Sequence, residues 1–129
     1  MRDLTALLRC LRPTLRPGVY VFCTAPADRT DIPALMTFHE VEGRTLIIEE
    51  AVAAAHRLVA RYRAAWVELG VPSDLDAVGL LAAVTGALAA AGISCNVVSA
   101  VHHDHLFVPA ERGAEAVAVL ERLSGENAG

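Results

Sequence analysis

The sequence predicts an α+β protein in which helices pack on one face of a sheet. Two observations lead to this fold class. The first is a stretch from Ala77 to Val101 that contains no Asp, Glu, Lys or Arg, and a segment of that length without charge is buried. The second is the order of hydrophobic patterns from Ala64 onward, which indicates strand, helix, strand, strand and helix. A helix between two strands returns the chain to the same sheet, so strands and helices share a core.

The elements of the first half follow from chain breakers and from alternation. A short helix is expected over Leu4–Leu11, because Pro13 ends it. Closely spaced proline and aspartate residues indicate a surface loop over 25–34. The other predicted elements of this half are a strand over Gly18–Thr24, two strands within Met36–Ile48 that turn at Glu42-Gly43, and a helix over Glu49–His56.

The charge-free stretch divides at Gly92. From Ala77 to Ala91 the larger apolar residues recur every three or four positions among alanines, which predicts a helix. Gly92 is placed to form a left-handed C-terminal cap, and Ser73 or Asp76 is expected to cap the N-terminus. Residues 93–101 alternate, which predicts a strand with one side against this helix. The many small and polar residues argue for a protein core and against a membrane span.

Three further elements complete the second half. Residues Ala64–Val71 alternate as a strand does, and His105–Pro109 is a short strand that proline ends. Residues Glu111–Leu123 place an apolar stripe among charged residues, which is typical of an amphipathic helix. One side of that helix is therefore expected to face solvent.

Composition excludes several classes of protein. The 129 residues carry 11 basic and 15 acidic side chains, a formal net charge of -4 and no lysine, which argues against a nucleic-acid surface. The cysteines Cys10, Cys23 and Cys95 follow no metal-ligand spacing, and no signal-peptide pattern is present. We therefore expect reduced cysteines in a cytoplasmic protein that binds neither nucleic acid nor membrane.

Histidines cluster at His102, His103 and His105, with Asp104 between them. On a strand, His103 and His105 project from the same face, which makes them weak candidates for a zinc or nickel site. The alternative is a polar hairpin turn that contains Asp104, and we favour it because no distant motif supplies further ligands.

Asp76–Gly79 opens an alanine-rich helix, and Ala90–Val97 passes through a glycine turn into a strand. These segments resemble the ACT modules of aspartokinases; the ACT domain is a small βαββαβ module that senses amino acids. The run His103–Pro109 is similar to a family of small uncharacterised bacterial proteins with two imperfect ACT-like modules. The resemblance implies a ferredoxin-like antiparallel sheet with helices on one face. It also implies two halves, a degenerate N-terminal half at 1–62 and an ACT module at 63–129.

The second module lacks one strand. Residues 124–129 are too few and too polar to close its sheet. We expect the strand Gly18–Thr24 to take the vacant edge, so that the two halves are intertwined.

The resemblance also implies a ligand site between the loop after the first strand and the second strand. Carried over by position, the ligand-binding residues are Val71, Pro72, Ser73, Asp74, Leu75, Asp76, Ala77, Val78, Gly79, Ser94 and Asn96, with Gly70 at the start of the loop. Amide groups at a helix N-terminus suit a ligand carboxylate, and Asp74 or Asp76 suits an ammonium group. The structural alternative is that Asp76 only caps the helix, Gly79 only lets the helix approach the sheet, and Asn96 is an ordinary strand residue.

The function predicted from these features is a non-catalytic regulatory module that binds an amino acid or an analogue. No nucleophile elbow, phosphate loop, dinucleotide fingerprint or close Cys-His pair is present, so we predict no enzyme activity and no cofactor. A homodimer is expected, because Val98 and Ala100 leave apolar area on the sheet face opposite the helices. The alternatives are an interaction or structural module without a ligand and, less favoured, a metal-binding protein that uses His102–His105.

Overall fold

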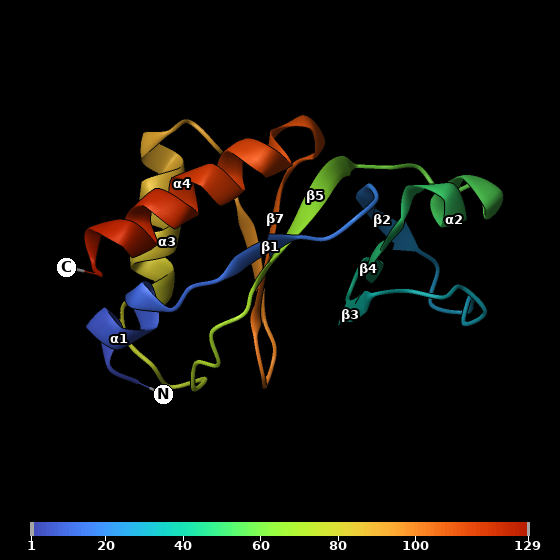
Figure 1. Cartoon of the computed structure of the whole chain (residues 1–129). Helices are drawn as coiled ribbons and strands as arrows, with labels where there is room; N and C mark the ends of the chain where they lie inside the picture. The colour runs from blue at the N-terminus through green and yellow to red at the C-terminus, as the bar shows by residue number, and fades with distance from the viewer. Residues whose placement is uncertain (1, 129) are drawn as a thin grey trace. The chain divides into compact units, whose positions relative to one another are not determined.

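The computed structural model describes residues 2–128 (Figure 1). Its elements are α1 (Leu4–Arg9), β1 (Pro13–Leu15), β2 (Tyr20–Ala25), β3 (Met36–Glu40), β4 (Gly43–Glu49), α2 (Glu50–Ala55), β5 (Tyr62–Leu69), α3 (Leu80–Ala90), β6 (Asn96–Ser99), β7 (Asp104–Pro109), a 3-10 turn (Ala110–Arg112) and α4 (Gly113–Glu126). The chain forms two compact units, which we call the split unit (Met1–Pro17 with Ala65–Gly129) and the continuous unit (Gly18–Ala64).

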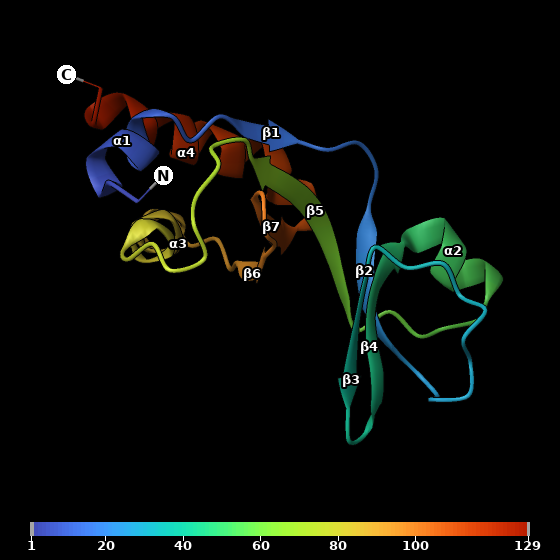
Figure 2. The ribbon, with the colours of Figure 1, turned by 90° about the horizontal axis from the view of Figure 1, so that it is seen from below.

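The split unit has a sheet with helices on one face. Strand β1 pairs antiparallel with β5, β7 lies next to β5, and β6 pairs antiparallel with β7. Helices α1, α3 and α4 contact one another and lie on the same side of these strands (Figures 1 and 2). The core consists of alternate residues of β5 and β7 and the apolar faces of the helices, among them Val67, Leu106, Leu88 and Leu120. The predicted order of strand, helix, strand, strand and helix is confirmed.

The C-terminal end of α3 is the glycine cap that the sequence predicts. Gly92 has a φ of +72°, in the left-handed region. Its N–H donates to the Ala89 carbonyl at 2.9 Å, and the Ile93 N–H donates to the Leu88 carbonyl at 2.9 Å. Leu88 and Ile93 are both buried in the core of the split unit. These two hydrogen bonds and the apolar pair define a Schellman motif, which ends the helix and starts the turn toward β6.

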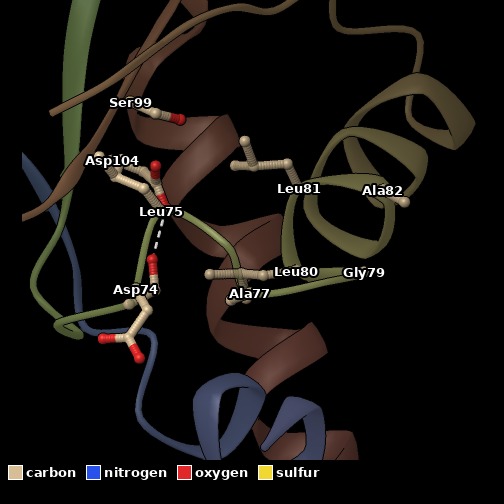
Figure 3. A pocket seen from close by; sticks show the side chains of 10 residues that line it. Asp74, Leu75, Ala77, Gly79, Leu80, Leu81, Ala82, Ser99 and Asp104 are labelled. Carbon is tan, nitrogen blue, oxygen red and sulfur yellow. Dashed lines mark hydrogen bonds between the residues drawn. The ribbon is translucent and has the colours of Figure 1, made fainter. Parts of the chain in front are cut away.

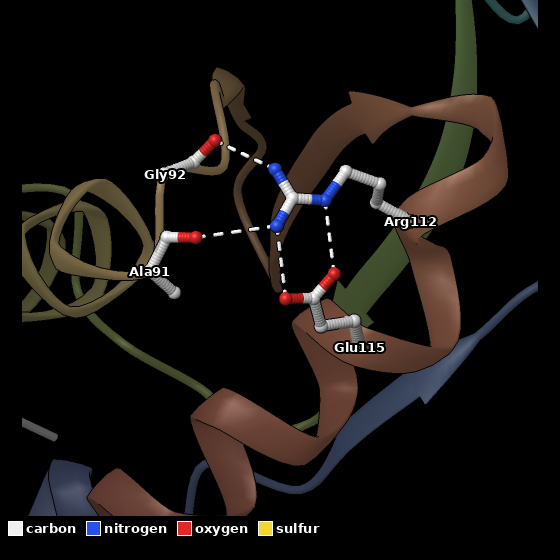
Figure 4. Close-up of polar contacts among 4 residues, drawn as sticks. All are labelled: Ala91, Gly92, Arg112 and Glu115. Atoms are coloured by element: carbon white, nitrogen blue, oxygen red, sulfur yellow. Dashed lines mark hydrogen bonds and ion pairs between the residues drawn. The ribbon is translucent and has the colours of Figure 1, made fainter.

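Arg112, which precedes α4, binds the same C-terminal end of α3 (Figure 4). Its guanidinium donates to the carbonyl oxygens of Ala91 at 3.2 Å and Gly92 at 2.6 Å. Its Nε and Nη2 atoms also bind the two carboxylate oxygens of Glu115, each at 2.9 Å. A cation at a helix C-terminus neutralises unpaired carbonyls and the negative end of the helix dipole.

The N-terminal end of α3 differs from the prediction. The helix begins at Leu80, and its N-cap is Gly79, with a φ of +98° and no side-chain cap. Ser73 and Asp76 do not cap it, because Ser73 donates to Asp104 and Asp76 pairs with Arg2. The charge-free stretch therefore forms a shorter helix than expected, followed by the short strand β6. Every helix within residues 2–128 is too short or too polar to span a bilayer.

The continuous unit contains the antiparallel strands β2, β3 and β4, with residues 62–64 of β5 next to β2. Alternate residues of β2 and β4, such as Val21, Cys23, Leu46 and Ile48, form its core together with Ile32 of the loop that follows β2. Helix α2 contacts both β2 and β4. The predicted hairpin and the helix that follows it are both present.

The strand that completes the sheet of the split unit is β1. Pro13 lies opposite Leu69 and Leu15 opposite Val67. The expected segment, Gly18–Thr24, instead becomes most of β2, which pairs with β4 and with the first residues of β5. The N-terminal half does supply strands that pair with β5, from two segments: Pro13–Leu15 pair with residues 67–69, and residues 20–22 of the predicted strand pair with residues 62–64. The prediction is therefore confirmed in part. β1 was not predicted, because it has only three residues, one of them a proline, and so short a segment shows no clear alternation.

All three cysteines are free. Burial raises the pKa of the Cys23 thiol, and it raises the pKa of Cys95 to about 11. Both thiols therefore ionise less readily than an exposed cysteine.

Candidate functional site

A small cavity lies at the N-terminal end of α3 in the split unit (Figure 3). Its volume is about 110 Å³. The loop after β5 and the first turn of α3 form most of its wall, and strands β6 and β7 contribute one residue each. The lining residues are Ser73, Asp74, Leu75, Ala77, Gly79, Leu80, Leu81, Ala82, Ser99 and Asp104.

The first turn of α3 gives the cavity a positive side. The first N–H groups of an α-helix have no carbonyl partner within the helix, and α3 has no side chain that caps them. The first intrahelical bond runs from the Ala83 N–H to the Gly79 carbonyl at 3.0 Å. The residues between these two, Leu80, Leu81 and Ala82, all line the cavity. Amide groups and the positive end of the dipole suit an anionic group such as a carboxylate.

Asp104 gives the cavity a carboxyl group on the side of the strands. The residue is 5 % exposed, and its Oδ2 accepts a hydrogen bond from Ser73 Oγ at 3.0 Å. Ser99 lies opposite Asp104 in the pairing of β6 with β7, and both line the cavity. A carboxylate has room for several hydrogen bonds and therefore suits a donor such as an ammonium group. The carboxyl group of Asp104 thus lies on the strand side of the cavity, and the N–H groups of α3 lie on the helix side. Figure 3 shows Asp104 and Ser99 across the cavity from the Leu81 side chain.

Two predicted ligand-binding aspartates are paired with an arginine. Arg2 Nε contacts Asp74 Oδ2 at 3.0 Å, and Arg2 Nη2 contacts Asp76 Oδ2 at 2.8 Å. The hydrogen bond from Arg2 is the main cause that lowers the pKa of the Asp74 carboxyl. Both pairs are exposed, so they hold the loop in place only weakly. Asp74 reaches the edge of the cavity, whereas Asp76 is not among its lining residues.

The structure brings some of the predicted site residues together and leaves others apart. Ser73, Asp74, Leu75, Ala77 and Gly79 line the cavity. The remaining predicted residues lie elsewhere: Val71 is buried in the core, Pro72, Asp76, Val78 and Ser94 are exposed, and Asn96 begins β6 with an exposed side chain. Gly70 has a structural role, because a Cβ there would lie 3.1 Å from Arg12 Cβ.

Five cavity residues were not predicted. Leu80, Leu81 and Ala82 continue the helix start just beyond the predicted Gly79, whereas Ser99 and Asp104 come from the strands. Alternation in the sequence already places Ser99 on the same strand face as Val97, which packs against the core under the helices. The same rule places Asp104 on the face opposite His103 and His105. Asn96 belongs to the other face of β6, which explains why it does not reach the cavity. The alternation of residues along the two strands therefore already indicated that Ser99 and Asp104 face the cavity.

The histidine cluster contributes to a different group of side chains. Asp104 is the first residue of β7 and not part of the turn. The indole of Trp66 donates from Nε1 to His105 Nδ1 at 3.0 Å, and the Arg16 guanidinium lies 4.4 Å from the Trp66 ring centroid. Burial lowers the pKa of His105, and the nearby Glu68 carboxylate partly opposes this effect.

A metal site at His103 and His105 would need further ligands. Across the described residues, 2–128, His, Cys, Asp and Glu side chains do not gather in groups of three or more with the geometry of a metal site. In addition, the Nδ1 atom of His105 is already used by Trp66.

Comparison with protein families matches both halves of the chain. One ACT domain family matches residues 1–65, and another ACT domain family matches residues 59–122. No curated protein matches the chain.

Solved structures show the same architecture. The VC0802 protein of Vibrio cholerae, described as of unknown function and a possible transport protein, is 37% identical, with 94% of this chain and 95% of that one covered and a TM-score of 0.85. The regulatory subunit of aspartate kinase from Thermus thermophilus, in its ligand-free form, is 11% identical, with 88% and 97% covered and a TM-score of 0.64. The protein Atu0741 from Agrobacterium tumefaciens is 18% identical, with 87% of each chain covered and a TM-score of 0.64. The two latter likenesses concern the fold alone.

Proposed function

The chain belongs to the ACT domain family, and on that basis we propose that it is a non-catalytic regulatory protein that binds a free amino acid or a close analogue. ACT domains are regulatory modules without catalytic activity of their own. We propose that the ligand occupies the cavity beside α3, in the loop and helix start that the sequence resemblance indicates. The protein it regulates is a separate chain or domain.

The arrangement of charge around the cavity is the observation that carries this proposal. An amino acid has a carboxylate and an ammonium group close together. The first turn of α3 offers amide donors to the carboxylate, and the buried Asp104 offers acceptors to the ammonium group. Ser73 holds the Asp104 carboxyl in place through its hydroxyl. The apolar residues Leu75, Leu80 and Leu81 are available to the ligand side chain.

The size of the cavity favours a small ligand. Its volume of about 110 Å³ is well below the roughly 300 Å³ at which pockets for drug-sized ligands begin. Nucleotides and other ligands of that size are therefore poor candidates. A small amino acid suits the space, and a larger one requires the exposed loop around Asp74 and Leu75 to move.

Thermal denaturation against the twenty amino acids tests the proposal. A ligand present at a hundred times its Kd raises the free energy of unfolding by about 2.7 kcal/mol. We expect at least one amino acid to raise the melting temperature of the protein. If all twenty leave it unchanged, the proposal is wrong, and the chain is an ACT module for interaction or structure without an amino-acid ligand.

Asp104→Asn locates the site once a ligand is found. The substitution keeps the size of the side chain and removes its charge, so the ammonium group loses a charge-assisted hydrogen bond. We expect calorimetry to show roughly tenfold weaker binding or worse. Asp28→Asn, an exposed aspartate of the continuous unit, is the matched control and keeps the wild-type affinity. Equal affinity of the Asp104 variant and the wild type would place the ligand elsewhere.

We further propose that the protein acts as a homodimer in the cytoplasm. Val98 is half-buried and Ala100 is exposed, and apolar area on the sheet face opposite the helices gains from contact with a second copy. The three free cysteines are those of a reducing compartment. Sedimentation velocity at micromolar concentration distinguishes dimer from monomer, and a monomer contradicts this part of the proposal.

A further inference from the structure

Arg44 is a buried cation that forms no ion pair with a carboxylate of residues 2–128. It lies in β4 of the continuous unit and is 8 % exposed. Among residues 2–128, none accepts a hydrogen bond from its Nε or its Nη2 atom. Buried polar groups are nearly always hydrogen-bonded, and a buried charge is nearly always paired. The position of Arg44 is therefore one that an additional acceptor would stabilise.

Arg44 has an apolar core on one side and a histidine on the neighbouring strand. Arg44 lies opposite Ala25 of β2 and opposite His39 of β3. Alternation along β4 places it on the same face as Leu46 and Ile48, which belong to the buried core of this unit. Ala25 is also the last residue of β2, so Arg44 lies where the loop over residues 26–35 leaves the sheet. Ile32 of that loop packs into the same core.

Three of the six carboxylates of the same unit are engaged with other groups, and the other three, Asp28, Glu42 and Glu49, are exposed. Asp31 pairs with Arg29, whose Nε lies 3.1 Å from Asp31 Oδ1. Glu50 pairs with Arg63, and the Thr45 hydroxyl donates to Glu40.

Two other arginines show what the free edge of Arg44 is suited to bind. Arg112 uses Nε and Nη2 to hold both carboxylate oxygens of Glu115, each at 2.9 Å. Arg63 uses the same two atoms to hold both oxygens of Glu50. Nε and Nη2 form one edge of the planar guanidinium, and their spacing matches the two oxygens of a carboxylate. The edge that binds a carboxylate in Arg63 and Arg112 is the edge that has no acceptor in Arg44.

We infer that Arg44 forms a second binding site, which holds the carboxylate group of a small molecule in a bidentate pair with Nε and Nη2. The ligand enters beside the loop over residues 26–35. A small free carboxylate is favoured over a side chain of another protein, because Arg44 is nearly inaccessible from the surface. The inference goes beyond the proposed function, since none of its residues belongs to the cavity beside α3.

The side-chain resonance of Arg44 tests the inference directly. The chain has 11 arginines and no lysine, so a nitrogen–proton spectrum of the Nε–H groups is simple enough to assign. We would titrate the full chain with sodium formate at pH 7 and, at equal ionic strength, with sodium chloride and sodium phosphate. The expected result is a saturable shift of the Arg44 Nε–H signal with formate only. An unmoved signal, or an equal response to chloride or phosphate, overturns the carboxylate site.

Arg44→Lys is the matched variant, because lysine keeps the charge and lacks the planar fork. We expect formate to bind roughly tenfold more weakly to this variant than to the wild type. Arg61→Lys, at an exposed position of the same unit, is the control and keeps the wild-type response. Unchanged formate binding in Arg44→Lys refutes the inference. If Arg44→Lys does not fold, the titration of the wild-type signal decides the question.

Discussion

Replacing Gly92 and Gly86 by alanine is expected to change stability in opposite directions, although both lie in or next to α3. A Cβ at either position meets no atom within 4 Å, so steric clashes contribute to neither change. Gly92 has a φ of +72°, which costs a residue with a Cβ about 1–2 kcal/mol. Alanine also lowers the conformational entropy of the unfolded chain, which stabilises the folded protein by roughly 0.4–1 kcal/mol. Gly92→Ala is therefore expected to lower the free energy of unfolding by about 1 kcal/mol.

Gly86 lies in the exposed middle of α3, where its backbone is helical. Alanine is a better helix former there and is expected to add about 0.5–1 kcal/mol to the free energy of unfolding. The two variants should thus differ by roughly 1.5–2 kcal/mol. Urea denaturation followed by the fluorescence of Trp66, the single tryptophan, measures this difference. The matched chemistry makes each variant the control for the other.

A neutral or stabilising effect of Gly92→Ala would refute the left-handed cap at the end of α3. Gly92→Asn adds a second check, because asparagine tolerates the left-handed region better than alanine. It is expected to be less destabilising than Gly92→Ala. A loss of stability in Gly86→Ala would show that this face of α3 is packed and not exposed.

The remaining predictions concern β1 and the histidine next to Trp66. Gly113→Ala is expected to destabilise the protein by about 1–3 kcal/mol, because a Cβ there would lie 2.9 Å from Ala65 Cβ and 2.7 Å from Leu15 Cδ1. Urea denaturation measures the change, and an unchanged free energy of unfolding would contradict the close packing of α4 against β5 and β1. The lowered pKa of His105 means that the unfolded chain takes up the proton first, so stability falls as the pH drops below the ordinary value of 6.5. His105→Gln is expected to remove this part of the pH dependence. Because Trp66 donates a hydrogen bond to His105, the pH titration of Trp66 fluorescence reports the protonation of His105. A midpoint of that titration at or above pH 6.5 would contradict the lowered pKa.

The elements of the second half were predicted from local rules. Their apolar residues recur with the periods of a helix or a strand, and these periods depend only on backbone geometry. The cap at Gly92 was also predictable, since a left-handed residue after a helix favours glycine wherever it occurs. The start of α3 was not, because Ser73 and Asp76 suit a cap by composition but bind Asp104 and Arg2 instead.

The candidate site was predicted in part. The loop around Ser73 and the start of α3 follow from the resemblance to ACT modules, and five of the expected residues line the cavity, namely Ser73, Asp74, Leu75, Ala77 and Gly79. Asp104 was assigned to a turn, although it is a buried strand residue. Its neighbours in sequence are histidines that suggested a polar surface. Only the pairing with β6 and the contact with Ser73 place its carboxyl in the cavity.

The sequence by itself determined the α+β class, the order of the elements after Ala64 and the resemblance to ACT modules. These features follow from periodicity, from glycine and proline, and from short motifs, all of which act within a few residues. Only the tertiary structure decided that β1 closes the sheet of the split unit and that Ser73 binds Asp104. It also decided that Arg44 is buried with no acceptor for its Nε and Nη2 atoms among residues 2–128. Such relations join residues that are distant in the chain, and they depend on the packing of the whole unit, which no local pattern encodes.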